Sequence, residues 1–517
     1  MAIATLDPLP SGPGSNTGQA ADQAGRWLAI PVLLYLATIL VPVGFHLGPL
    51  NMNGQRLLLL VLVVPLTVRL LAGHYGRVLW TDILFLLYIL WVMVAMAVNN
   101  PDRALVFFGS QAVEFIGGYV LGRACIRTRA DFIALCKAVV ALVCLTLPFA
   151  LVETATGRAP ILHAIQSLPG VRSASGLDVS LRMGQRMGVY RVQGIFQHPI
   201  LYGLFCALIF PLAFTALKGL VAPVTRYLLS AAVGLCAFLS LSAGPLLAMV
   251  LVGILIGWAW ALQRVAARWW WLLALFVAGY VVVDLLSNRT PIRVFLTYAT
   301  FSPHTAFNRL ITFEWGMVNV RANPIFGIGL NDWVRPAWMR SGSMDNFWLV
   351  NAVRYGIPGF ALLATGYLIA LWHIGRRDFD ADPVLWQLRR GWMIAFVGLT
   401  FTLATVHIWH ALYSFVFFLF GAGMWMMTAT PADGAAARPD PDAGPEGMGF
   451  RRSPAPATPP PDAPQGPLAS APAADPAPFA RRHGPAERSA PRLPYTRFSP
   501  TGTGDRAPPA GYTRRGD

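Results

Sequence analysis

Charged residues are scarce in this sequence: only 12% of its 517 residues are Asp, Glu, Lys or Arg, whereas 55% are hydrophobic. A soluble protein carries roughly 25% charged residues to cover its surface. The apolar residues stand in blocks of about 20, which is the length of a helix that crosses a bilayer. The composition therefore excludes a soluble protein and predicts an integral membrane protein.

Lysine is almost absent, so arginine carries nearly all of the positive charge behind the formal net charge of +16. The arginines stand mainly at the ends of apolar blocks, and the sequence shows no basic helix or aromatic-basic groove. The excess therefore indicates membrane topology and affinity for phosphate, and we expect no nucleic-acid partner. The five cysteines show no metal-ligand spacing, and we expect no disulfide framework, no metal and no cofactor.

About twelve candidate spans predict an all-α, polytopic helical bundle. The spans start near Leu28, Arg56, Leu79, Ala104, Phe132, Pro199, Tyr227, Pro245, Trp269, Ile357, Trp392 and Ala411. The stretch 231–260 is divided into two spans, because serine, glycine and proline within 240–245 interrupt a helix. Among ionisable residues inside the spans, Glu114 is the most central, and we expect it to pair with an arginine.

The short loops predict the orientation of the bundle. Basic residues gather in loops 73–77, 123–131, 217–226, 263–268 and 375–390, whereas loops 99–103 and 408–410 are nearly free of them. Basic loops stay in the cytoplasm. We therefore expect a multi-pass protein of the bacterial inner membrane with both termini cytoplasmic.

The chain divides into three parts by composition. Residues 1–26 are a short polar cytoplasmic segment, 27–429 form the transmembrane domain, and 430–517 are a disordered cytoplasmic tail rich in Pro, Ala and Arg. Two long extracytoplasmic loops, at about 154–197 and 287–354, contain aromatic and glycine motifs. Long ordered loops in a compact protein are usually functional.

Three motifs follow one another in these outer regions. The first is Arg-Val-Gln-Gly-Ile-Phe-Gln-His-Pro at 191–199, and the second is Leu-Ser-Leu-Ser-Ala-Gly at 239–244. The third has four elements, namely Asn-Arg-Leu at 308–310, Asn-Pro-Ile-Phe-Gly-Ile-Gly at 323–329, Asp345-Asn346, and Gly-Ile-Pro-Gly at 356–359. Its order predicts that Arg309 begins an amphipathic helix and that the glycine turn ends it. Asp345-Asn346 should precede a short helix, and Gly-Ile-Pro-Gly should begin the next span.

This succession resembles the O-antigen ligase and polymerase family of bacterial membrane glycosyltransferases. The resemblance implies a GT-C-like bundle that transfers a glycan, with inversion, from an undecaprenyl-pyrophosphate carrier on the periplasmic face. By resemblance, Arg191 and Arg309 bind the pyrophosphate. Two positions depart from the pattern: Asp345 stands where the ligases carry histidine, and Ala243 replaces an arginine. The first departure favours a polymerase over a ligase.

The residue chemistry favours the same roles. Arginine holds its charge at any pH and matches phosphate oxygens with a planar fork of donors. The acceptor hydroxyl needs a base, for which Asp345 is the candidate and His304, Glu314 and Asp332 are reserves. His198, Asn346 and Trp315 are further substrate-binding candidates.

Each assignment has a structural alternative. Arg191 and Arg309 could pair with lipid head groups, and Asp345 could cap the helix that follows it. His198 could be an interfacial polar residue, and Trp315 could belong to an interfacial aromatic belt.

The leading interpretation is a polymerase of O-antigen or exopolysaccharide that acts on undecaprenyl-pyrophosphate-linked repeat units. Its partners would be these lipid-linked saccharides, membrane lipids and a chain-length regulator protein. One alternative is an O-antigen ligase that transfers glycan to lipid A core. An alternative from another class is a secondary transporter or flippase, for which Glu114 and the break at 240–245 are the midplane candidates.

Overall fold

The computed structural model describes residues 28–47, 50–168, 172–173, 184–265, 267–288, 290–291, 294, 303–339 and 342–429. The predicted N-terminal segment 1–26 and the tail 430–517 lie outside the described residues. The two long loops predicted at about 154–197 and 287–354 are called the first and the second outer segment. The helices up to the middle of the first outer segment are α2 (Ile30–Leu40), α3 (Gly54–Leu71), α4 (Trp80–Asn99), α5 (Pro101–Ala112), η1 (Val113–Gly117), α6 (Gly118–Cys125), α7 (Arg129–Thr156) and α8 (Pro160–Gln166). After it come α9 (Pro199–Pro211), η2 (Leu212–Ala216), α10 (Pro223–Leu239), α11 (Ala243–Ala261), α12 (Arg268–Leu286), α14 (Pro303–Ala322), α15 (Phe347–Gly375), α16 (Pro383–Thr402), α17 (His410–Gly421) and η3 (Met424–Met427).

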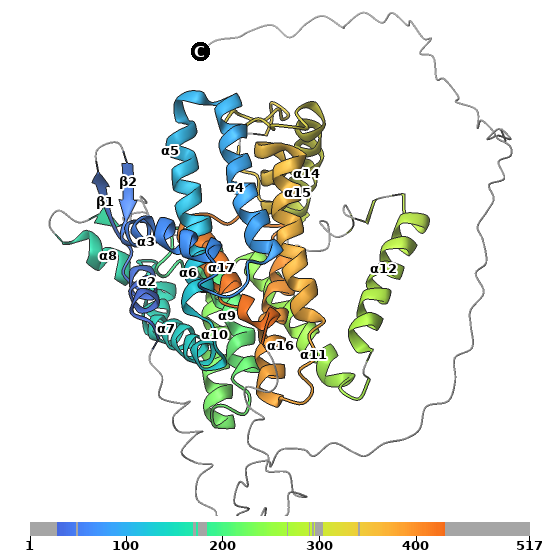
Figure 1. Cartoon of the computed structure of the whole chain (residues 1–517). Coiled ribbons are helices and arrows are strands. Elements are labelled where there is room, and N and C mark those ends of the chain that lie inside the picture. The colour runs from blue at the N-terminus through green and yellow to red at the C-terminus, as the bar shows by residue number, and fades with distance from the viewer. Residues whose placement is uncertain are drawn as a thin grey trace, which may run out of the picture. The chain divides into compact units, whose positions relative to one another are not determined.

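The bundle is all-α and suited to a membrane (Figure 1). Each of the twelve predicted spans corresponds to a helix, and the break at 240–242 divides α10 from α11 as expected. Among the described residues, nine helices are long and apolar enough to cross a membrane. Three of the twelve do not qualify: α2 has 11 residues, α10 has 17, and α16 carries two arginines in a less apolar sequence. The chain is a multi-pass membrane protein with fewer full-length spans than predicted.

Short strands, which the all-α prediction did not include, tie the first outer segment to the start of the bundle. β1 (Val43–Leu47) pairs antiparallel with β2 (Leu50–Asn53) and with β3 (Arg172–Ser173), in the order β2-β1-β3. A second hairpin joins β4 (Gln185–Arg186) to β5 (Val189–Tyr190). Backbone pairing of this kind satisfies N–H and C=O groups that a loop would otherwise leave open.

The basic loops meet at one end of the bundle. Arg123 donates to the Tyr75 and Arg77 carbonyls, both at 3.1 Å, which joins loops 73–77 and 123–131. Arg129 pairs with Asp382 at 2.9 Å and so joins loop 375–390 to them. The Asp382 carboxylate therefore neutralises one of the arginines at this end of the bundle. These contacts place three of the five predicted cytoplasmic loops on a common side.

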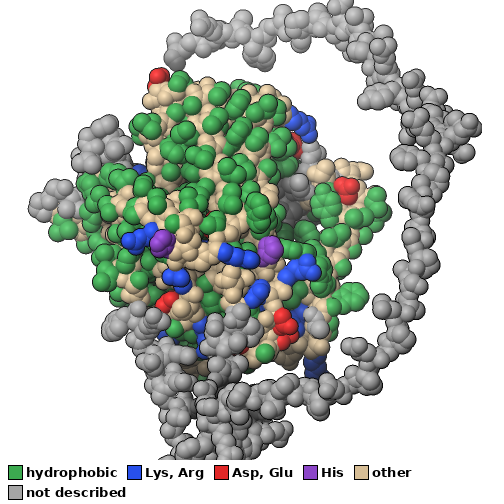
Figure 2. Space-filling view, in the orientation of Figure 1, with side chains coloured by type: hydrophobic (Ala, Val, Ile, Leu, Met, Phe, Trp, Pro, Cys, Tyr) green, Lys and Arg blue, Asp and Glu red, His purple; other side chains and the backbone are tan. Residues whose placement is uncertain are grey.

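The length of α11 gives the distance between the end of the bundle with the basic loops and the end with the first outer segment. α11 starts directly after Ser242, is 19 residues long, and leads into the basic loop 263–268. A helix of that length rises about 28 Å, which is close to the thickness of a bilayer's hydrocarbon core. Figure 2 shows hydrophobic side chains over most of the visible surface, with basic side chains gathered across its middle and lower part.

Candidate functional site

Arg191 stands on an extended segment directly after β5. Its Nη2 donates a hydrogen bond of 2.6 Å to Oγ of Ser242, the residue that precedes α11. The Ser242 hydroxyl donates in turn to the Ser240 carbonyl at 3.0 Å, so its lone pairs are available to the guanidinium. The helix break at 240–242 therefore orients Arg191. Among the described residues, the buried Nε of Arg191 has no hydrogen-bond acceptor.

Glu153, near the end of α7, fixes the backbone that follows Arg191. Its carboxylate accepts the N–H groups of Gln193 and Gly194 at 2.8 and 3.0 Å. Gly194 has a φ of +59°, and a Cβ there would lie 2.8 Å from the Tyr202 ring. Only glycine tolerates both conditions. The first outer segment thus holds Arg191 directly before a rigid turn.

Asp345 and Asn346 have different roles at the start of α15. Asn346 is the N-cap, and its side-chain oxygen accepts the Leu349 N–H at 3.0 Å. Asp345 is exposed, and Ser343 Oγ donates to its Oδ1 at 2.8 Å. The capping alternative for Asp345 is therefore wrong, because Asn346 performs that role. Asn346 is 8% exposed and is committed to the backbone.

A kink in α15 provides backbone acceptors for the second outer segment. Gly356 has a φ of +72° and a ψ of −179°, so the short helix before it and the span after it are distinct, as the sequence predicted. Pro358 has no N–H, which leaves the Arg354 carbonyl without its helical partner. The turn 327–329 donates two N–H groups to the Val353 and Arg354 carbonyls at 2.9 and 3.0 Å. The glycine turn is therefore a structural support for the kink.

A third segment, 403–409, joins the two outer segments. The Phe347 N–H donates to the Leu403 carbonyl at 2.8 Å, and Trp409 Nε1 donates to Gln197 Oε1 at 2.9 Å. The His407 ring lies between them, 6.0 Å from the Phe347 ring and 6.2 Å from the Trp409 ring, in stacked orientation at both. The start of α15 and the end of the first outer segment are thereby neighbours.

Charged groups from both outer segments form one cluster. His198 lies within electrostatic range of Arg191, Arg186 and Asp345. Asp345 also lies within electrostatic range of Arg309. His198 and Asp345 therefore link Arg191 electrostatically to Arg309, although 118 positions separate the two arginines in the sequence.

His198 is the N-cap of α9, where its Nδ1 accepts the Ile200 N–H at 3.2 Å. Burial lowers the pKa of His198 from 6.5 to about 4, and the nearby guanidiniums of Arg191 and Arg186 lower it further against the opposing effect of Asp345. The imidazole is therefore neutral at pH 7. Because Nδ1 is an acceptor, Nε2 carries the proton and is a hydrogen-bond donor.

Arg309 lies in the second turn of α14, since the helix begins at Pro303. The prediction that Arg309 begins this helix is wrong by about two turns. The residue is 9% exposed. Burial lowers the pKa of its guanidinium while Asp345 raises it, and arginine stays charged in either case.

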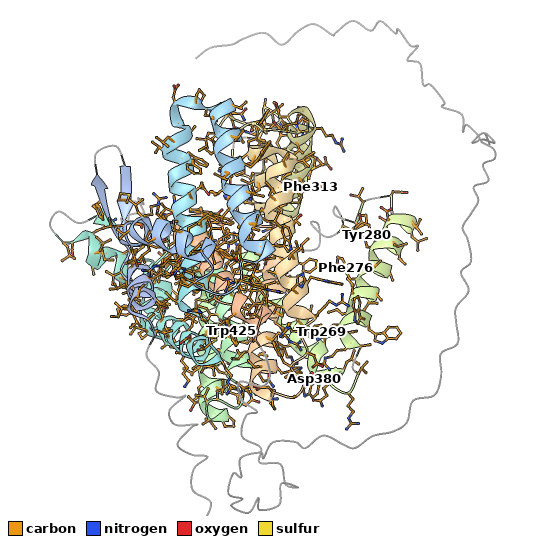
Figure 3. All side chains as sticks on the ribbon, viewed as in Figure 1. Trp269, Phe276, Tyr280, Phe313, Asp380 and Trp425 are labelled. Carbon is orange, nitrogen blue, oxygen red and sulfur yellow. The ribbon has the colours of Figure 1, made fainter. Side chains whose placement is uncertain are left out.

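The remaining predicted residues have other surroundings. Trp315 packs against a small second core formed by α14, the loop that follows it and the start of α15. Figure 3 labels Phe313 of the same core. Asp332 is exposed and pairs with Arg335, Glu314 is partly buried, and the side chain of His304 lies outside the described residues. Within the described part of the chain, no group of three or more His, Cys, Asp or Glu is arranged to hold a metal ion.

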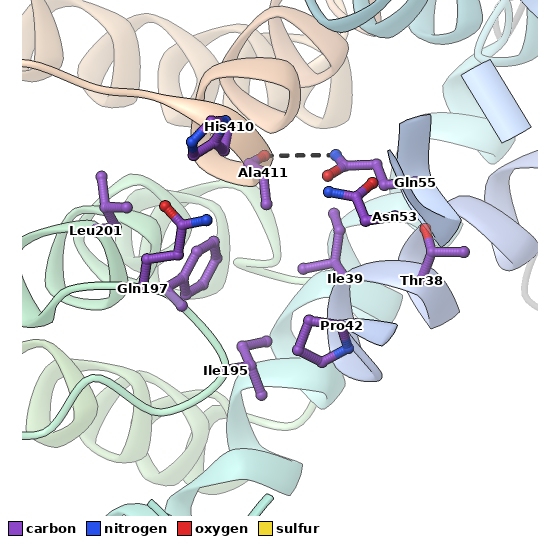
Figure 4. A pocket seen from close by; sticks show the side chains of 11 residues that line it. Thr38, Ile39, Pro42, Asn53, Gln55, Ile195, Gln197, Leu201, His410 and Ala411 are labelled. Atoms are coloured by element: carbon purple, nitrogen blue, oxygen red, sulfur yellow. Dashed lines mark hydrogen bonds between the residues drawn. The ribbon is translucent and has the colours of Figure 1, made fainter. Parts of the chain in front are cut away.

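Glu114 lies at the π-helical turn η1 and pairs with an arginine, as predicted. Arg56 Nε donates to its Oε1 at 2.7 Å, and His410 Nδ1 lies 3.0 Å from Arg56 Nη2. A pocket of about 410 Å³, which includes space open to solvent, opens beside His410 and Gln197 (Figure 4). Its lining also contains Thr38, Ile39, Pro42, Asn53, Gln55, Ile195, Phe196, Leu201 and Ala411.

The comparison with protein families identifies the central region. Residues 228–364 match the family model described as O-antigen ligase. This region is an O-antigen ligase family domain. No curated protein matches the chain. The match confirms the family resemblance found in the sequence and supports an O-antigen ligase or polymerase type of function in general.

The matched region contains one half of the cluster. Arg309 and Asp345 lie inside the O-antigen ligase family domain, as does Ser242, the partner of Arg191. Arg191 and His198 precede the domain, and segment 403–409 follows it. The site is therefore assembled by the family domain together with the helices on either side of it.

Several residues of the site were not predicted from the sequence. These are Arg186, whose Nη1 donates to the Leu241 carbonyl at 3.0 Å, Glu153, and His407 and Trp409 of the third segment. The Val-His-Ile-Trp-His sequence at 406–410 was the available signal, because two histidines and a tryptophan are unusual in a short loop between apolar spans.

Proposed function

We propose that the chain is a polysaccharide polymerase that transfers undecaprenyl-pyrophosphate-linked glycan onto a lipid-linked acceptor at the periplasmic face of the bacterial inner membrane. The observation that supports this proposal most is the cluster in which Asp345 and His198 connect Arg191 with Arg309. The family match supports glycan transfer in general.

Arg191 and Arg309 would bind the pyrophosphate of the carrier. During transfer the acceptor hydroxyl attacks the anomeric carbon, the bond from that carbon to the pyrophosphate oxygen breaks, and negative charge develops on the leaving group. Preorganised donors at such a charge are worth about 3 kcal/mol each in transition-state stabilisation. Arg191 is preorganised by Ser242, and its buried Nε has no acceptor among the described residues.

Asp345 would take the proton of the acceptor hydroxyl, since it is exposed and lies within electrostatic range of both His198 and Arg309. His198 would donate its Nε2 proton as a hydrogen bond to a phosphate or sugar oxygen. We propose that the reaction needs no metal, because two guanidiniums neutralise the pyrophosphate in the way that a divalent cation does elsewhere.

An O-antigen ligase is the second candidate, because the matching family model is described by that activity. The absence of histidine at position 345 argued against it from the sequence. However, His198 supplies an imidazole within electrostatic range of Asp345. The site therefore offers both groups to an acceptor on lipid A core.

The polymerase proposal predicts the products of two variants. Arg191→Ala and Arg309→Ala should each abolish long-chain polymer while single repeat units persist, as seen on a gel of surface polysaccharide. Arg158→Ala is the matched control, because it removes an exposed arginine from the same outer segment and should leave chain length unchanged. Normal chain lengths from both site variants would overturn the role assigned to the arginines.

Deletion of the gene distinguishes the two candidates. A missing polymerase leaves only single repeat units, whereas a missing ligase leaves polymer on its carrier. A chain-length regulator is the protein partner that we propose for the polymerase. Cross-linking of the two in membranes tests that interaction.

A further inference from the structure

α12 is held only loosely by the bundle. None of its side chains is buried, although its sequence is that of a membrane span. Two ring contacts join it to neighbouring helices, Trp270 with Trp372 of α15 at 6.0 Å and Phe276 with Phe401 of α16 at 5.5 Å. Figure 1 draws α12 beside the bundle, and Figure 3 shows Phe276 and Tyr280 along it. Within the described part of the chain, most of this helix is therefore left uncovered by protein.

Two arginine side chains lie close together at the start of α12, on the side of the bundle where the basic loops lie. Arg268 is the first residue of α12, and Arg390 belongs to α16. Both guanidiniums lie over the same indole ring, because the Cζ atoms are 5.9 and 4.9 Å from the centroid of Trp386. The shared ring attracts both cations, but the two charges repel each other.

The carboxylates near this pair of arginines interact with other arginines. Asp382 pairs with Arg129 at 2.9 Å, and Asp378 and Asp380 lie within electrostatic range of Arg389. Among the described residues, Arg268 and Arg390 have no ion pair.

Some hydrogen-bond donors of these two arginines also lack an acceptor. Arg268 Nη1 donates to the Gln263 and Val265 carbonyls, but the buried Nε atoms of both Arg268 and Arg390 have no acceptor among the described residues. Buried donors are normally satisfied. In addition, the N-cap of α12 makes no side-chain hydrogen bond, and the positive end of a helix dipole favours an anion.

We propose that an anionic phospholipid binds between α12 and α16, with its phosphate between Arg268 and Arg390 and its acyl chains along α12. Charge complementarity and the uncovered side of α12 both favour a lipid over a free anion, since a free anion would leave that side exposed. Trp269, Trp270 and Trp271 stand at the same end, where tryptophan suits the head-group region. The site is separate from the catalytic cluster, which lies at the opposite end of α11.

The test measures phospholipid binding to the full-length chain. Purified protein in neutral detergent is titrated with phosphatidylglycerol, and bound lipid is counted by native mass spectrometry. The variant Arg268→Gln/Arg390→Gln should bind phosphatidylglycerol about thirtyfold more weakly than the natural chain. The matched control is Arg127→Gln/Arg264→Gln, which removes two exposed arginines from the same end of the bundle and should bind it unchanged.

Two further titrations identify the ligand. Phosphatidylcholine should bind both proteins weakly, and inorganic phosphate should not displace phosphatidylglycerol from the natural chain. Equal binding by the site variant, an equal loss in the control variant, or displacement by inorganic phosphate would each overturn the proposal. Thermal unfolding in phosphatidylcholine nanodiscs checks that the variants are folded. If the double variant does not fold, the single variant Arg390→Gln replaces it.

Discussion

Arg191 is oriented before any substrate arrives, because Ser242 accepts one of its donors and Glu153 fixes the turn that follows it. Preorganisation of this kind lowers the reorganisation that a charged site must undergo during reaction. His198 is also fixed, by its hydrogen bond to the backbone of α9. At this scale the site is a set of side chains whose positions are determined by neighbouring helix ends.

Two half-buried histidines predict a loss of stability in acid. The folded-state pKa of His198 is about 4 and that of His407 about 3, both lowered chiefly by burial, whereas the ordinary value is 6.5. The unfolded chain takes up protons near pH 6.5 that the folded chain does not accept. Stability should therefore decrease as pH falls from about 6.5 to 4, which thermal unfolding in detergent can measure.

The variant His198→Asn tests the contribution of one histidine. Asparagine retains the N-cap but cannot be protonated in this range, so the pH dependence should become shallower while stability at pH 7 is preserved. His163→Asn is the control, because His163 is exposed on α8. An unchanged slope in His198→Asn would contradict the neutral state of this half-buried imidazole.

At the scale of elements, the kinked helix α15 determines where the second outer segment lies. The short helix before Gly356 carries Asn346 at its start, and the turn 327–329 binds the carbonyls that the kink exposes. The sequence predicted this arrangement, because glycine and proline affect the backbone locally. The sequence could not predict that segment 403–409 contacts Gln197, since those residues are more than 200 positions apart.

The variant Gly356→Ala should disrupt the folded structure of the second outer segment. A Cβ at this position would lie 1.9 Å from the Ile325 carbonyl oxygen, and the combination of φ and ψ there is accessible only to glycine. We expect a loss of more than about 3 kcal/mol in stability, measured by thermal unfolding, together with loss of transfer activity.

Gly253→Ala is the matched control for that prediction. Gly253 lies inside α11, and an added Cβ there meets nothing within 4 Å. Alanine is the better helix former by about 1 kcal/mol, so this variant should be at least as stable as the natural chain. Equal stability of Gly356→Ala and Gly253→Ala would contradict the role of the kink.

For the whole molecule, the sequence predicted the all-α membrane bundle, the common side of three of the basic loops and the family. These properties follow from the lengths of apolar blocks and the placement of charge. It overestimated the number of full spans, because length alone does not separate a short or polar helix such as α2 or α16 from a crossing helix. It also missed the supports of the site, such as Glu153, which act through contacts distant in the sequence.

The central claim is that Arg191 and Arg309 act on one pyrophosphate. Binding of undecaprenyl pyrophosphate by the natural chain, Arg191→Gln, Arg309→Gln and the double variant tests this claim most directly. Two arginines on one diphosphate should be coupled, so the loss in the double variant should differ from the sum of the single losses by at least about 0.5 kcal/mol. Strictly additive losses, or affinity for the carrier unchanged by both substitutions, would contradict the account.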